Sequence, residues 1–179
     1  MLTLKETKAK DIFSYDDLDK LPAGLYEIID GRIIEMTPSG IIHGFSENKV
    51  GKILDENLSQ KGYVLTGEVG ILISKEPLKI RGADIAFVTK DRLKTIDKGI
   101  LKISPDLIVE ILSPSDVYLA VDAKIKDYID IGVNRIVIIN PEEKIISTIS
   151  EDRSLRFYTF DDEVEFYKDV KIKLAEVMK

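Results

Sequence analysis

Few residue types in this chain are available for acid–base, metal-ligand or nucleophilic chemistry. Its 179 residues include 32 Asp and Glu, a single histidine and no cysteine. Without cysteine, thiolate nucleophiles, disulfides and cysteine-based zinc or iron–sulfur sites are excluded. One histidine excludes the HExxH zinc motif and any multi-histidine cage. The chemistry of an enzyme with this sequence must come from carboxylates, lysine, tyrosine, serine or His43, with or without a metal ion.

Two carboxylates draw attention because they lie within or beside apolar strands. Glu110 lies near the end of the apolar run 107–112, so it must be neutral, paired or bound to a cation, because an unpaired buried carboxylate is costly. The alternative is a glutamate that points out of a sheet edge or pairs with one lysine. Asp84 begins a strand expected at 84–88, where an aspartate more often caps local backbone. On neighbouring strands, the two would form the oxygen-rich site that Mg²⁺ or Mn²⁺ prefers.

Lys124 has a structural and a functional interpretation. It lies at the flank of the apolar stripe of a helix expected at 116–131. A lysine in that position commonly extends its ammonium group to solvent. Held beside two metal-bound carboxylates, it would instead orient an attacking water and stabilise a pentavalent phosphate.

Three further polar residues have the same two interpretations. His43 and Glu47 are one helical turn apart on an inward face. A lone, hydrogen-bonded histidine is the common outcome there, and an acid–base group is the alternative. Glu27 shares a strand face with Leu25 and Ile29, where an exposed glutamate is the default.

The elements that must position these residues follow from turn signals and periodicity. Asp30-Gly31 predicts a hairpin with a type I′ turn. The N-terminal half is predicted to contain a tail at 1–13, a capped helical turn at 14–18, hairpin strands at 25–29 and 32–36, a helix at 39–61 ended by Gly62, and short strands at 63–67, 70–74 and 84–88.

The C-terminal half adds the elements of a parallel crossover. They are a buried strand at 107–112, a helix at 116–131 capped by Ser115 and ended by Gly132, a buried strand at 135–139, hairpin strands at 145–149, 155–160 and 163–167, and a short helix at 174–178. Strand–helix–strand over 106–139 predicts a right-handed crossover, whereas the hairpins need antiparallel partners. We therefore predict a mixed sheet in an α/β or α+β domain.

Length and hydropathy limit the number of domains and the location that we expect for the protein. A chain of 179 residues fits one domain over 1–179. The N-terminus has no continuous apolar segment of a signal peptide, and no run approaches 18 apolar residues, so we expect no membrane span and a cytoplasmic location. A net charge of -6 disfavours a broad basic surface, but it permits an enzyme that meets phosphates through a divalent cation.

The order of motifs along the chain resembles that of a known family. The motifs are Tyr26-Glu27-Ile28-Ile29-Asp30-Gly31, then His43-Gly44 on a helix, Asp84-Ile85-Ala86-Phe87-Val88, Pro105-Asp106-Leu107-Ile108-Val109-Glu110-Ile111-Leu112-Ser113-Pro114-Ser115, Lys124 in a helix that ends Tyr128-Ile129-Asp130-Ile131-Gly132-Val133, and Asn140-Pro141. This set, over about residues 14–150, resembles the Uma-type restriction endonucleases, a bacterial family in the PD-(D/E)XK nuclease superfamily.

The resemblance implies a restriction-endonuclease-like core, with a mixed central sheet flanked by helices and a divalent-metal site at the open end of its central strands. It implies Asp84, Glu110 and the backbone carbonyl of Ile111 as ligands of Mg²⁺ or Mn²⁺, and Lys124 as the catalytic lysine. His43 and Glu27 match recurrent polar positions and are further catalytic candidates. The implied activity is hydrolysis of DNA phosphodiester bonds, with DNA as substrate and a homodimer as the assembly that cuts two strands.

Two positions depart from the superfamily pattern. The residue two after the acid is Leu112 where the pattern has lysine, so Lys124 must reach the site from its helix. Ala83 stands where a proline usually precedes the aspartate. Two other interpretations therefore stay open: a non-catalytic nuclease-fold module that binds DNA or a protein partner, and a metal-dependent hydrolase of a small phosphoester.

Overall fold

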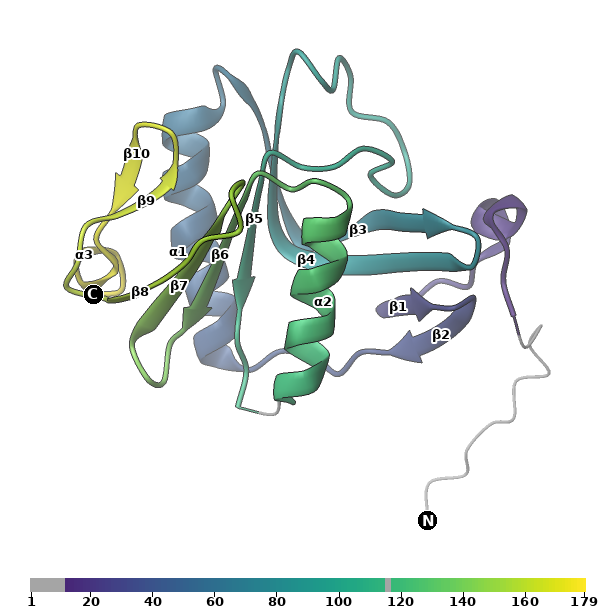
Figure 1. Ribbon diagram of the computed structural model, residues 1–179, viewed down its shortest axis with the longest axis horizontal. Coiled ribbons are helices and arrows are strands. Elements are labelled where there is room, and N and C mark those ends of the chain that lie inside the picture. Colours follow the sequence, from purple (N-terminus) through teal and green to yellow (C-terminus); the bar gives the residue numbers. More distant parts are fainter. Residues whose placement is uncertain (1–11, 115–116) are drawn as a thin grey trace.

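A mixed β-sheet with helices on both faces forms the frame of the protein (Figure 1). The computed structural model describes residues 12–114 and 117–179. In chain order the elements are η1 (Tyr15–Lys20), β1 (Tyr26–Ile29), β2 (Arg32–Glu35), α1 (Ile41–Leu58), β3 (Gly62–Lys75), β4 (Leu78–Thr89), β5 (Leu107–Ile111), α2 (Tyr118–Asp130), β6 (Arg135–Asn140), β7 (Ile145–Ser150), β8 (Leu155–Thr159), β9 (Val164–Tyr167), β10 (Val170–Ile172) and α3 (Leu174–Val177).

The sheet combines antiparallel hairpins with one parallel pair, as the sequence predicts. Within the described residues its strands run in the order β2-β1-β4-β5-β6-β7-β8, and β3 pairs with β4. The pair β5–β6 is parallel, with Ile108 opposite Ile136, and α2 connects the two strands. Because both faces of β5 are covered, every residue of that strand is buried, which explains its continuous apolar run.

The N-terminal elements form where local signals place them. The backbone N–H and the hydroxyl of Ser14 both donate to the Asp17 carboxylate, at 2.9 and 2.6 Å, and cap η1. Asp30 and Gly31 have φ of 51° and 77°, as a type I′ turn requires. Residues 1–11 of the expected tail lie outside the described residues, but the Phe13 N–H donates to the Gly31 carbonyl at 2.7 Å.

Two predictions around residue 62 are wrong. Gly62 does not end the preceding helix, because α1 already ends at Leu58 and Gly62 begins β3. A Cβ on Gly62 would collide with the Val88 carbonyl and the Phe87 ring, so glycine is required here by close approach to β4. The two short strands expected at 63–67 and 70–74 are one strand with a β-bulge between Thr66 and Val69, since an inserted residue bends a strand without ending it.

The remaining differences concern element boundaries and the C-terminus. β4 begins at Leu78, six residues before Asp84, so Asp84 lies inside a long strand rather than at its start. The expected cap Ser115 lies outside the described residues, and α2 begins at Tyr118. Strands β9 and β10 form a separate two-stranded sheet instead of extending the meander.

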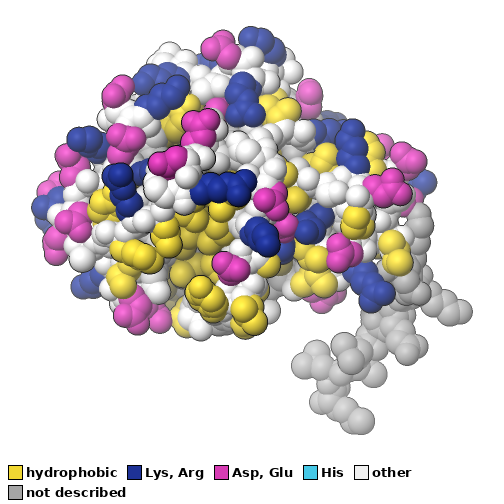
Figure 2. All heavy atoms as spheres, viewed as in Figure 1, with side chains coloured by type: hydrophobic (Ala, Val, Ile, Leu, Met, Phe, Trp, Pro, Cys, Tyr) yellow, Lys and Arg dark blue, Asp and Glu magenta, His cyan; other side chains and the backbone are white. Residues whose placement is uncertain are grey.

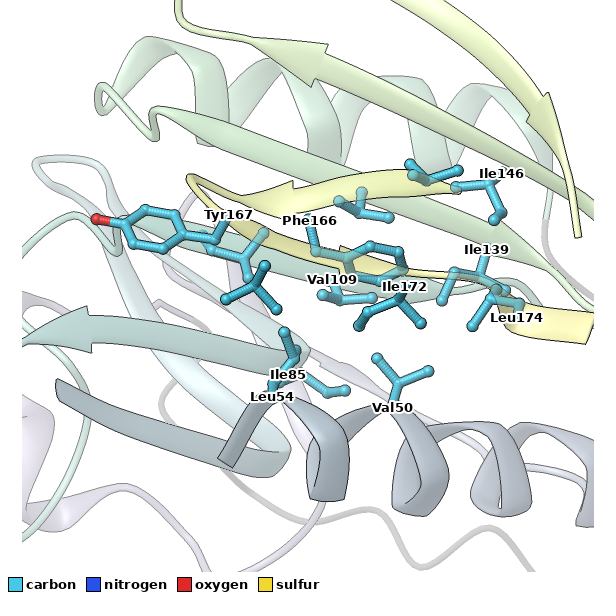
Figure 3. Close-up of a cluster of buried hydrophobic side chains, with 14 of the residues drawn as sticks. Val50, Leu54, Ile85, Val109, Ile139, Ile146, Phe166, Tyr167, Ile172 and Leu174 are labelled. Atoms are coloured by element: carbon cyan, nitrogen blue, oxygen red, sulfur yellow. The ribbon is translucent and has the colours of Figure 1, made fainter. Parts of the chain in front are cut away.

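The two faces of the sheet carry separate apolar clusters. Val50, Leu54 and Leu58 recur every four residues and form an apolar stripe on α1. They are fully buried and pack against β4, β5 and the β9–β10 sheet (Figure 3). On the opposite face, Tyr128 of α2 packs against Ala86 and other residues of β4, β5 and β6. Among the described residues, no helix combines the length and hydropathy needed to cross a bilayer.

Charged groups of both signs are interspersed on the face shown in Figure 2, and no broad basic surface is visible on it. Hydrophobic side chains gather near its lower centre, where α2 begins. Val117, Tyr118 and Leu119 are largely exposed there.

Two glycines should respond in opposite directions to alanine. We expect Gly62→Ala to lower the free energy of unfolding by about 1–3 kcal/mol, because its Cβ has no room against β4. Gly44 lies in α1 with no neighbouring atom within 4 Å of a Cβ, so Gly44→Ala should raise it by about 0.5–1 kcal/mol. Urea unfolding of both variants measures the difference. A neutral Gly62→Ala would contradict the close approach of β3 to β4.

Candidate active site

Asp84 and Glu110 face each other across neighbouring strands. In the antiparallel pair β4–β5, Ile85 is opposite Val109, and the next step of this register places Asp84 opposite Glu110. Their exposed fractions are 2% and 6%. The backbone N–H of Ile111 donates to Asp84 Oδ2 at 2.6 Å. An aspartate at the start of a strand more commonly caps a local turn. Asp84 instead accepts a hydrogen bond from the neighbouring strand β5.

Lys124 points inward and pairs with Glu110. Its Nζ lies 2.8 Å from Glu110 Oε2, and its side chain is 16% exposed, so the solvent-extended lysine is not what the structure has. The hydroxyl of Tyr128, one turn along α2, lies 2.8 Å from Glu110 Oε1 and 3.0 Å from the Gly82 carbonyl. The sequence by itself assigned Tyr128 no role at the site. Both oxygens of Glu110 thus have partners on α2.

Burial and neighbouring charges shift the pKa values of Glu110 and Lys124. Burial raises the pKa of Glu110 to about 7, although the Lys124 ammonium opposes the shift. For Lys124, burial acts to lower the pKa, but the carboxylates of Glu110 and Glu27 outweigh it and hold the pKa above its ordinary value. Lys124 therefore stays charged at neutral pH.

Glu27 is the end of a second buried network rather than an exposed residue. Its side chain is 12% exposed and its Oε2 lies 2.7 Å from Arg81 Nη1. Its Oε1 accepts from the Gly82 N–H at 3.1 Å and lies 3.7 Å from Lys124 Nζ. Arg81 Nε also pairs with Asp127 of α2 at 2.7 Å. Through Arg81, strand β1 and helix α2 are fixed to β4 on either side of Lys124.

His43 approaches Asp84 from α1. Its Nε2 lies 3.2 Å from Asp84 Oδ1 and its side chain is 7% exposed. The hydrogen bond to Asp84 raises the pKa of His43, and burial opposes the shift. Nδ1 is buried without a hydrogen-bond partner. One turn later on α1, Glu47 Oε1 accepts from the Gly67 N–H at 2.7 Å.

Glu68 is a site residue that sequence analysis missed. It lies at the β3 bulge with a φ of 57°, and its Oε2 is buried without a partner. Burial and the neighbouring charge of Asp84 raise the pKa of Glu68 to about 7. Gly82 leaves the space for it, since a Cβ there would lie 2.7 Å from Glu68 Oε2. The available signal was an acid between two glycines in a strand, which favours a bulge.

The structure thus brings Asp84, Glu110, Lys124, His43 and Glu27 together, with the Ile111 peptide bonded to Asp84. A cavity of about 180 Å³ opens beside them. Its lining includes Glu27, Arg81, Glu110 and Lys124, together with apolar residues of β2–α1 and α2.

The donor set suits a divalent cation. Asp84 lies close enough to Glu68 and Glu110 that its charge is one reason why the pKa values of these two carboxyls are raised. The unpartnered Glu68 oxygen also leaves an acceptor to be satisfied. Carboxylate and carbonyl oxygens are the ligands that Mg²⁺ and Mn²⁺ take.

Comparison with known proteins gives a family and a fold. The model of the family Uma2, described as "Putative restriction endonuclease", matches residues 14–174. Among solved structures, the crystal structure of a putative nuclease belonging to DUF820 from Anabaena variabilis has a TM-score of 0.79 and 19% sequence identity, and the match covers 93% of this chain and 97% of that one. At this identity the likeness shows the fold alone. The curated proteins contain no significant match.

Neutralising Glu68 should stabilise the protein at high pH. Because the pKa of Glu68 is raised to about 7 in the fold, ionisation costs stability as the pH rises from about 4.5 through 7. We expect Glu68→Gln to raise the free energy of unfolding by about 1–2 kcal/mol at pH 8, after allowance for partial solvent screening, and to change it little at pH 4. Urea unfolding with EDTA at both pH values measures this.

The matched control is Glu56→Gln, which removes an exposed acid of α1 and should leave the stability at both pH values nearly unchanged. A Glu68→Gln effect that is larger at pH 4 than at pH 8 would contradict the buried, strained carboxyl.

Proposed function

Because the chain belongs to the Uma2 family, whose description is "Putative restriction endonuclease", we propose that it is a divalent-metal-dependent endonuclease that hydrolyses DNA phosphodiester bonds. The family match supports nuclease function in general. The observation that carries the specific proposal is the buried Lys124 ammonium 2.8 Å from Glu110, on the strand beside Asp84. Asp84, Glu110 and Lys124 thereby combine the two acids and the lysine of the superfamily pattern, although residue 112, where that pattern has lysine, is leucine.

Asp84, Glu110 and the carbonyl of Ile111 are the residues that would hold Mg²⁺ or Mn²⁺. Such an ion supplies positive charge that polarises a phosphate oxygen and lowers the pKa of a bound water. Asp84 is already fixed for this task by the Ile111 N–H. Glu110 is fixed by Tyr128 and Lys124, so both carboxylates are preorganised before substrate arrives.

Lys124 acts on the attacking water and on the phosphate. Its raised pKa keeps the ammonium charged at neutral pH, so it can donate to a water molecule and offset the negative charge that develops on the phosphate oxygens. Glu27 lies 3.7 Å from the same ammonium, and Arg81 holds Glu27 in turn. His43 orients Asp84 through its Nε2.

The partners of the reaction are part of the same proposal. DNA is the substrate, a second copy of the chain completes a homodimer that cuts both strands, and the reaction takes place in the cytoplasm. The alternative is a non-catalytic nuclease-fold module that binds DNA or a protein partner. The net charge of -6 and the interspersed charges of the face in Figure 2 favour this alternative, whereas the inward Lys124 favours the enzyme.

Lys124→Ala should abolish cleavage while the protein stays folded and still binds a divalent ion. Loss of the only ammonium group 2.8 Å from Glu110 among the described residues should lower the rate of supercoiled plasmid cleavage by about 100-fold or more. Lys126→Ala, an exposed lysine of the same helix, is the matched control and should cleave as the wild type does. Circular dichroism of both variants tests the fold.

A second variant covers the case in which Lys124→Ala unfolds. Glu110→Gln keeps the size of the side chain, and its amide oxygen can still accept from Lys124 while its NH2 group donates to the Tyr128 hydroxyl, which keeps the Gly82 carbonyl as its acceptor. The substitution removes the carboxylate charge, so we expect folded protein without cleavage. Cleavage at the wild-type rate by Lys124→Ala would refute the role of the lysine. A wild-type protein that binds the ion and DNA without cutting would favour the module.

A further inference from the structure

Asp84 has a second set of neighbours, on the side of α1, that the proposed ligand set does not use. A nitrogen of His43 and carboxylate oxygens of Glu47 and Asp84 all lie within 4.8 Å of one another. His43 and Glu47 are one turn apart on α1, so a single rigid helix presents both. One nitrogen and two carboxylates at this spacing can coordinate a single metal ion.

The two carboxylates of this set are held in place by backbone groups. The Ile111 N–H binds Asp84 Oδ2, which leaves Oδ1 on the side of His43, 3.2 Å from Nε2. The Gly67 N–H binds Glu47 Oε1, so the bulge of β3 fixes the direction of the Glu47 side chain. The donors are thus oriented before any ion binds, as second contacts orient the ligands of metal sites.

An independent observation at His43 indicates that something is missing from its surroundings. The side chain is 7% exposed, yet Nδ1 is buried without a hydrogen-bond partner. Buried ring nitrogens are nearly always paired, and an unpaired one calls for a water, an ion or another group. An ion that takes one nitrogen of His43 would fix the ring orientation and leave the other to a water molecule.

The α2 side of the site has different chemistry. On that side Glu110 is bonded to Lys124 and Tyr128, and the ligands proposed for the ion there are all oxygen atoms. On the α1 side, no lysine or arginine among the described residues pairs with Glu47 or Asp84 in the structure. Asp84 is the residue that the two sides share.

We propose that His43, Glu47 and Asp84 bind a divalent transition-metal ion such as Mn²⁺, on the α1 side of Asp84 and next to the ion proposed at Glu110. Imidazole nitrogen suits transition metals, whereas Mg²⁺ takes oxygen ligands and keeps its waters. This subsite should therefore discriminate against Mg²⁺. The inference deepens the proposed function and rests on it for the neighbouring ion, but the subsite itself is tested by binding.

Pulsed electron paramagnetic resonance of bound Mn²⁺ tests the subsite directly. Because the chain has one histidine, nitrogen modulation from a coordinated imidazole in the untagged protein can come only from His43. We expect that modulation in the wild type and its loss in His43→Gln. By isothermal titration, His43→Gln and Glu47→Gln should each weaken Mn²⁺ binding by about 10-fold or more, while Mg²⁺ binding changes much less in His43→Gln.

Glu56→Gln, an exposed acid of the same helix, is the control and should bind Mn²⁺ as the wild type does, with the nitrogen signal intact. Thermal unfolding of each variant verifies that it is folded. Mn²⁺ bound without nitrogen modulation, or with unchanged affinity in His43→Gln, overturns the subsite and leaves the endonuclease proposal standing. Nitrogen-coordinated Mn²⁺ in a wild-type protein that cuts no DNA supports the subsite and counts against the endonuclease.

Discussion

The site depends on one buried ion pair, Glu110 with Lys124. A carboxylate in the middle of an apolar strand is costly unless a counter-charge and hydrogen bonds replace the lost water. Here the counter-charge comes from α2, which crosses the sheet between β5 and β6 and carries Lys124 and Tyr128 one turn apart toward Glu110. The Glu110 carboxylate of β5 thus helps to fix the position of α2.

Arg81 connects this pair to the rest of the frame. It lies in β4 and holds Glu27 of β1 and Asp127 of α2 at 2.7 Å each. Each of the two acids also has a second cation, since Asp127 pairs with Lys79 at 2.9 Å and Glu27 lies 3.7 Å from Lys124. The charges therefore form one connected network. It holds α2 at a fixed height on the sheet, and with it the ammonium of Lys124.

Glu68, which lies near Asp84, is less well paired than Glu110. Glu68 is placed by a bulge and has a buried oxygen without a partner, and its pKa is raised by burial and by the charge of Asp84. Such an arrangement is less stable than a neutral one and persists because the surrounding strands fix it. The same excess of negative charge would attract a divalent cation, so the strain and the proposed function have one cause.

The amino-acid sequence by itself determined the mixed sheet, the Asp30-Gly31 hairpin, the apolar stripe of α1 and the buried β5, because each depends on local turn chemistry or periodicity. It also singled out Glu110, since a charge inside an apolar run needs an explanation from any fold. Glu68, Tyr128 and the inward turn of Lys124 were decided only by the tertiary structure. Each of these features depends on a partner from another strand or helix that is distant in the chain. The sequence near a bulge, a packed hydroxyl or a flexible side chain does not identify that partner.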